Sequence, residues 1–77
     1  MYRYMICTCA NEDVFYRQCK ALELHIRRLK KELFLIDVDW SLIQEYSLDG
    51  KQIIVHNSRY LDEVFIESEI ELEQFFK

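Results

Sequence analysis

The chain carries a single glycine, Gly50, and no proline among its 77 residues. Nucleotide-binding loops use several glycines together, because the backbone must approach a phosphate closely. A P-loop or a dinucleotide-binding turn is therefore excluded. The same glycine fixes one turn, since Asp49-Gly50 is a dipeptide that favours a two-residue type I′ hairpin turn. We predict a hairpin formed by residues 42–48 and 51–57.

Three further elements are predicted before this hairpin. Residues 2–9 are short, alternating and rich in aromatic and β-branched side chains, which is typical of a strand. Residues 12–32 carry one apolar stripe at helical spacing, which predicts a long helix that begins after an N-cap at Asn11. Residues 33–40 alternate again and predict a second strand. The stripe consists of Phe15, Cys19, Leu22, Ile26, Leu29 and Leu33.

The last twenty residues permit three interpretations. In the first, residues 62–67 form a strand and a short helix capped at Ser68 follows. In the second, residues 58–66 form a helix and residues 69–76 a closing strand, which gives the βαββαβ order of a ferredoxin-like fold. In the third, residues 58–77 form a single helix.

All three interpretations lead to one α+β domain that spans residues 1–77. We predict a two-layer sandwich in which an antiparallel sheet of about four strands carries one long and one short helix on one face. The three cysteines are an odd number, which fits a reducing compartment. Neither a secretory signal nor a run of ~20 apolar residues is recognisable. We therefore expect a cytoplasmic protein that makes no membrane contact.

Two groups of side chains are candidates for catalysis or metal binding. Asp37 and Asp39 share one face of a predicted strand and could hold a cation through oxygen, but their spacing equally predicts the polar side of that strand. The possible thiol and imidazole ligands lack the paired spacing of structural zinc sites and are interpreted as core residues. We predict no catalytic residue, no metal site and no cofactor, and hence a non-enzymatic protein. The ligands considered for zinc are Cys7, Cys9, Cys19, His25 and His56.

Charge is distributed unevenly along the chain. Residues 1–31 have a balance of +4 and residues 32–77 a balance of −8. Regularly spaced carboxylates can replace phosphates in a basic groove, and such contacts associate fast and depend on salt. The leading hypothesis is a small inhibitor or regulator, of a size that suits a phage or a mobile element, that mimics nucleic acid and occupies a basic protein surface. Its acidic contact residues are Glu63, Glu67, Glu69, Glu71 and Glu73.

Two aromatic side chains complete this predicted surface. Tyr2 and Tyr4 are expected on the sheet face that the helices leave open, where they would supply apolar contact to the partner or to a second copy in a homodimer. The alternative function is nucleic-acid binding, with the same tyrosines stacking on bases and with a basic side of the helix contacting phosphates. The basic residues of this alternative are Arg17, Lys20, Arg27, Arg28 and Lys31.

Overall fold

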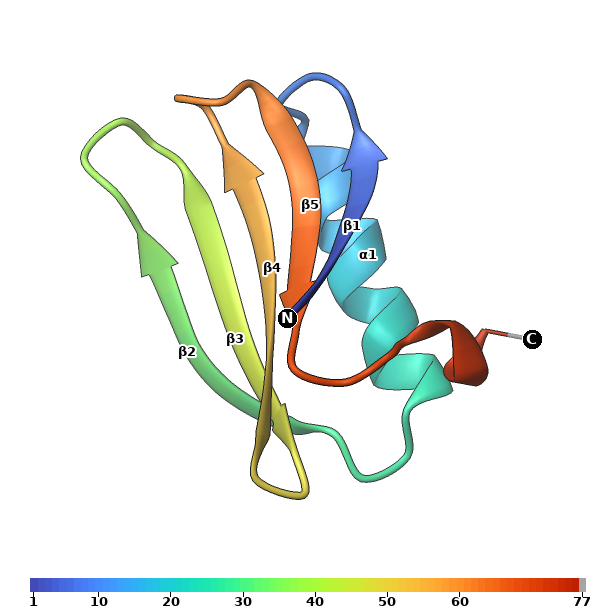
Figure 1. Ribbon diagram of the computed structural model, residues 1–77. Coiled ribbons are helices and arrows are strands. Elements are labelled where there is room, and N and C mark those ends of the chain that lie inside the picture. Colours follow the sequence, from blue (N-terminus) through green and yellow to red (C-terminus); the bar gives the residue numbers. More distant parts are fainter. Residues whose placement is uncertain (77) are drawn as a thin grey trace.

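A computed structural model describes residues 1–76, and within them one α-helix packs on one face of a five-stranded antiparallel sheet (Figure 1). The strand order is β1-β5-β4-β3-β2, so β1 and β2 form the two edges. The chain is α+β as predicted, with a fifth strand and with a single 3₁₀ turn in place of the short helix. The elements are β1 (Tyr2–Cys7), α1 (Glu12–His25), β2 (Lys30–Ile36), β3 (Leu42–Leu48), β4 (Lys51–Ser58), β5 (Glu63–Ser68) and η1 (Glu73–Phe75).

The predicted hairpin is confirmed. β3 and β4 pair in register from Leu42 opposite Asn57 to Leu48 opposite Lys51. Asp49 and Gly50 have φ values of 51° and 80°, which are the left-handed conformations that a type I′ turn requires.

The core lies between α1 and the sheet. Phe15, Leu22 and Ile26 are buried on the sheet side of the helical segment. β3, and β4 from Ile53 onward, alternate buried and less buried residues, as a sheet with one covered face should, whereas in β5 Phe65 is buried on the opposite face as well. Asn11 begins the helix, because its side chain accepts a hydrogen bond of 3.1 Å from the Val14 backbone N–H.

The predicted helix is too long, since α1 ends at His25 rather than near residue 32. Ile26 has an extended backbone but is still buried, and Leu29 also packs against the core from the turn that follows. The helical spacing of apolar residues therefore continues past the point where the helix stops. Pairing of the next residues with β3 outweighs their helix propensity.

The predicted orientation of the first strand is wrong for Tyr2, Tyr4 and Met5, although Cys7, which follows a bulge, does pack against the core. Tyr4 pairs with Ile66, a core residue, and its hydroxyl accepts a hydrogen bond of 2.9 Å from the Leu72 N–H. Tyr2 lies on the same side, with its ring stacked 6.5 Å from that of Tyr4. Both tyrosines thus face the α1 side of the sheet, because strand alternation alone does not indicate which face a core will cover.

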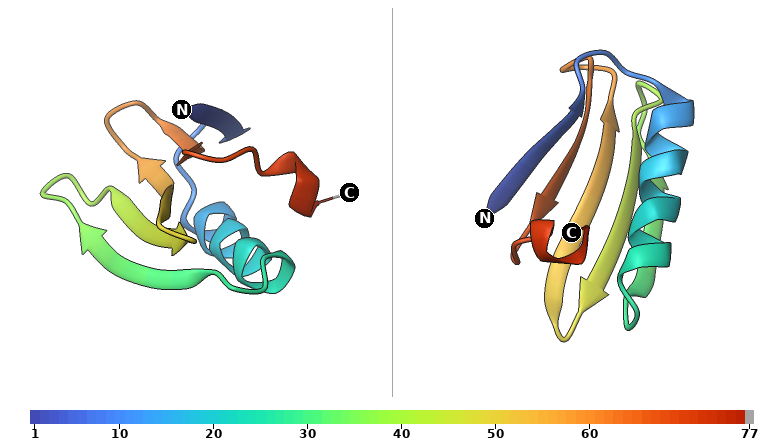
Figure 2. Two further views of the ribbon diagram at one scale, coloured as in Figure 1. Left: turned by 60° about the horizontal axis from the view of Figure 1, so that its bottom comes forward. Right: turned by 90° about the vertical axis from the view of Figure 1, so that its right-hand side faces the viewer.

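At the C-terminus, the first interpretation is confirmed for its strand, since β5 covers Glu63–Ser68. The helix expected after Ser68 is wrong, because the Ser68 hydroxyl closes a local turn by bonding the backbone of Ile70 and η1 is a single turn. The ferredoxin-like order and the single C-terminal helix are both wrong. The segment after β5 crosses to the α1 side, where Leu72 is buried (Figure 2).

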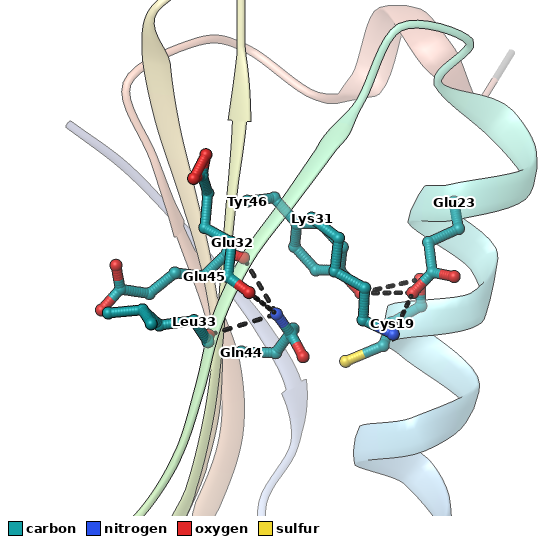
Figure 3. A network of polar contacts seen from close by, with 8 residues as sticks. All are labelled: Cys19, Glu23, Lys31, Glu32, Leu33, Gln44, Glu45 and Tyr46. Atoms are coloured by element: carbon teal, nitrogen blue, oxygen red, sulfur yellow. Dashed lines mark hydrogen bonds and ion pairs between the residues drawn. The ribbon is translucent and has the colours of Figure 1, made fainter.

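The edge strand β2 contains a bulge between Lys31 and Phe34. Gln44 stabilises it from the neighbouring strand, because its buried amide group donates to the carbonyl oxygens of Leu33 (3.2 Å), Glu45 (3.0 Å) and, more weakly, Glu32 (3.5 Å) (Figure 3). Main-chain acceptors that the bulge leaves outside the ladder are satisfied in this way.

Candidate protein-binding face

Cross-strand pairing lines up one side chain from every strand on the sheet face opposite α1. Met5 pairs with Phe65, and Phe65 with His56. His56 pairs with Ile43, and Ile43 with Leu35. These five residues form what we call the open-face row. Within residues 1–76, α1 and η1 both lie on the other face of the sheet (Figure 2).

The open-face row has a buried centre and exposed ends. Phe65 is only 6% exposed, because the His56 ring stacks on it at 4.5 Å and the Arg3 guanidinium lies 4.3 Å from its centroid. Met5 and Leu35, at the two edges of the sheet, are 48% and 43% exposed. A partner would therefore meet apolar side chains at both edges and a preformed aromatic platform between them.

Carboxylates flank this row. The adjacent row runs Arg3–Glu67–Ile54–Glu45 by the same pairing. Figure 3 shows Glu45 pointing away from α1, on the side opposite to Tyr46. Glu63 also lies on this face, where its Oε1 atom accepts a hydrogen bond of 2.9 Å from the Arg3 guanidinium and forms an ion pair with it. The open face is thus an apolar band beside acidic groups.

His56 and Glu67 form a close pair within this face. Their Nε2 and Oε1 atoms are 3.0 Å apart, but the geometry is not that of a hydrogen bond. Burial lowers the pKa of His56 and outweighs the opposite effect of the Glu67 carboxylate. The imidazole is therefore neutral near neutral pH and contributes to the face mainly by stacking on Phe65.

The predicted acidic row is divided by the fold. Glu63 and Glu67 lie on the open face of β5, but the strand ends at Ser68. The Glu69 carboxylate accepts a hydrogen bond of 2.6 Å from the Gln52 N–H, whereas Glu71 is exposed just before η1 and Glu73 is exposed as its first residue. The expected continuous row is wrong, because its alternation spans the end of a strand.

Glu45 joins Glu63 and Glu67 on the open face, and sequence reasoning missed it. It alternates with the buried Gln44 and Tyr46 in a strand that was predicted correctly. That alternation was the available signal, but the position of Glu45 beside β5 residues depends on pairing across β4.

The predicted basic side of the helix is also dispersed. Arg17 and Lys20 are exposed on α1, whereas the other three residues follow the end of the helix. Arg28 forms a 2.8 Å ion pair with Asp49, and the Lys31 ammonium lies 3.6 Å from the Glu23 carboxylate. The structure therefore does not bring Arg17, Lys20, Arg27, Arg28 and Lys31 onto one helical face.

The residues considered for metal binding are placed apart from one another. Cys19 is buried in the core, as predicted, and Cys7 packs against the core from outside. Cys9 is exposed, and its Sγ atom lies 3.7 Å from that of Cys7. Burial raises the pKa of the Cys19 thiol. The pKa of Cys9 is raised by the hydrogen bond between the Cys9 and Cys7 thiols. Among residues 1–76, no three His, Cys, Asp or Glu side chains are grouped as metal ligands.

Asp37 and Asp39 belong to a loop, so their predicted place on a strand is wrong. The Asp37 carboxylate accepts the Val38 N–H, and the Asp39 carboxylate accepts the Ser41 N–H at 3.0 Å. The Ser41 hydrogen bonds also lower the pKa of Asp39. Both carboxylates line a hollow of ≈ 340 Å³ at the end of the open face, whose apolar walls include Leu61 and Phe65.

Comparisons with protein-family models, with curated proteins and with solved structures found no match to this chain. No helix in residues 1–76 is long and apolar enough to cross a membrane. The geometry of the open face is therefore the main guide to function.

Proposed function

We propose that this chain is a non-enzymatic binding module, an inhibitor or regulator that contacts a basic protein surface through the open face of its sheet. The observation that carries this proposal is the open-face row, which crosses all five strands beside Glu45, Glu63 and Glu67. An apolar band with a charged border has the composition of a protein interface, with a hydrophobic centre and a polar rim.

The stacked centre of the face favours this function energetically. The His56 ring and the Arg3 guanidinium are already stacked on the buried Phe65, so little side-chain entropy is lost when a partner covers them. The neighbouring carboxylates would attract a basic partner and accelerate its association, with an effect that salt weakens.

The hollow beside the row supplies an anchor for one partner side chain. Its walls combine the apolar surfaces of Leu61 and Phe65 with the carboxylates of Asp37 and Asp39. A lysine or arginine has this dual character, since its aliphatic stem packs on apolar groups and its head bonds carboxylates.

The proposal is tested by capturing proteins from a lysate of the source organism with three forms of the chain. The double variant Glu45→Gln/Glu67→Gln removes two open-face charges, and Glu71→Gln/Glu73→Gln removes two charges from the C-terminal segment as a matched control. We expect the wild type and the control to retain the same basic protein and the open-face variant to lose it. Equal capture by all three forms, or loss in the control alone, would contradict the proposal.

A further inference from the structure

The strand β2 is an exposed edge of unusual composition. All seven of its residues are exposed, and four of them are consecutive apolar side chains, Leu33 to Ile36. β2 ends the strand order, so its outer side pairs with no strand of residues 1–76. Long apolar edges of this kind readily pair with another strand, and most proteins block them with charge or proline.

The main-chain groups of this edge are directed outward at two positions. The Asp37 N–H donates to Ser41 at 2.9 Å, and the Leu33 carbonyl accepts from the Gln44 side chain, so both residues face β3. Because these groups alternate along a strand, those of Leu35 also face β3, whereas those of Phe34 and Ile36 point away from the sheet. Phe34 and Ile36 can therefore each donate one N–H and accept at one C=O in hydrogen bonds with a further strand.

The charges of this region select the orientation of the pairing strand. Lys30 and Lys31 begin β2, and Asp37 and Asp39 follow its end. An antiparallel copy of the same segment places the basic start of each strand beside the acidic end of the other, whereas a parallel copy would place like charges together. The strand is complementary to itself.

We infer that two copies of this chain pair through antiparallel β2 strands, with a two-fold axis at Leu35. The bulge at Lys31–Phe34 leaves the strand regular from Phe34 onward, and this axis pairs Phe34 with Ile36, which both lie on the α1 side. Phe34 and Ile36 then exchange both hydrogen bonds with their counterparts. Such a contact is isologous and closed, as in most homodimers.

The resulting dimer has one continuous ten-stranded sheet, and the α1 helices of both copies lie on the same face of it. Leu35 is the last member of the open-face row, so the two rows meet at the axis and form one band across both copies. The homodimer expected from Tyr2 and Tyr4 is replaced by one at the opposite edge. This inference does not depend on the proposed partner, and it concerns the purified chain alone.

Sedimentation equilibrium from micromolar to near-millimolar concentration tests this dimer. Leu35→Lys and Leu35→Glu each place like charges at the axis, and we expect each to weaken self-association by about tenfold or more. Because Leu35 faces itself, mixing the two variants should restore a one-to-one pair. Leu24→Lys adds the same charge on α1 as a control and should dimerise as the wild type does.

A second variant tests the backbone contact directly. Ile36→Pro removes an outward N–H, a position where an edge strand tolerates proline, so circular dichroism should remain unchanged while self-association is lost. A monomeric wild type throughout the concentration range would overturn the inference. So would Leu35→Lys dimers as stable as wild type, or a failure of the Lys and Glu variants to pair when mixed.

Discussion

The Tyr46 hydroxyl donates a hydrogen bond of 2.6 Å to the Oε2 atom of Glu23, and this bond joins the middle of β3 to the last part of α1 (Figure 3). Tyr46 is fully buried, and the other acceptor of its hydroxyl, the Cys19 carbonyl oxygen, is more distant at 3.5 Å, so the hydroxyl depends mainly on Glu23. Burial, with the bond to the Glu23 carboxylate, raises the pKa of Tyr46 far above its ordinary value, and the phenol remains protonated.

Tyr46→Phe should therefore lower the free energy of unfolding by about 1.5–3 kcal/mol, the usual contribution of a hydrogen bond to a charged group. Urea unfolding followed by circular dichroism measures this change. Tyr60→Phe is the matched control, because Tyr60 is 88% exposed and should be neutral. Equal stability of the Tyr46 variant and wild type would show that the bond contributes nothing.

Gln44 offers a second test of the fold at the β2 bulge. Gln44→Met keeps the length of the side chain but leaves the Leu33 and Glu45 carbonyl oxygens without this donor. We expect the free energy of unfolding to fall by about 1–3 kcal/mol and the backbone amides of β2 to exchange hydrogen faster. The exposed Gln52→Met should change neither quantity. Unaltered exchange in β2 would indicate that the bulge does not depend on Gln44.

We expect Gly50 to stabilise the turn through its backbone conformation and not through the room that its missing side chain leaves. Its φ is +80°, and a Cβ atom added there would meet no atom within 4 Å. Gly50→Ala should therefore cost about 1 kcal/mol through backbone strain. Asp49→Asn should cost less, because asparagine also adopts the left-handed conformation. Thermal unfolding compares the two variants, and a larger loss for Asp49→Asn would contradict this explanation of the turn.

Stability should depend on pH through His56. Its folded pKa lies below the ordinary value of 6.5, so the unfolded chain takes up a proton first as the pH falls. The contribution of neutral His56 is complete above pH 6.5 and declines as the pH drops below that value. Stability should thus rise with pH across this window, and His56→Gln should reduce the slope.

The control for this measurement is His25→Gln, the same chemical change at an exposed residue of α1. Urea unfolding at a series of pH values gives both slopes. If His56→Gln retained the slope of the wild type, or if His25→Gln alone removed it, burial of His56 would not be the cause.

The sequence predicted the features that depend on neighbouring residues. Asp49-Gly50 defines its turn by φ alone, and Asn11 begins the helix by a bond to Val14, three residues away. The end of α1 was not predictable in this way, because Ile26 and Leu29 keep the helical spacing after the helix has stopped. Local spacing cannot distinguish a helix from a turn that buries the same side chains.

The candidate site was less predictable than the fold, because it depends on register. The open-face row combines four strand pairings, and a shift of one residue in any of them would replace its members. The sequence predicts Glu67 as a contact residue, but its cross-strand neighbours Arg3 and Ile54 come from distant parts of the chain. Tyr4 was assigned to the wrong face because the covering segment at Leu72 could not be foreseen.

The claim that the open face binds a basic protein is tested most directly by photo-crosslinking from two exposed apolar positions, one on the open face and one on α1. A benzoylphenylalanine at Met5 probes the open face at β1, away from the proposed β2 dimer contact, and one at Leu24 probes the exposed back of α1. In a lysate of the source organism, we predict a crosslinked basic protein from position 5 and none from position 24. Crosslinks that form from position 24 and not from position 5 would contradict the assignment of the open face as the binding surface.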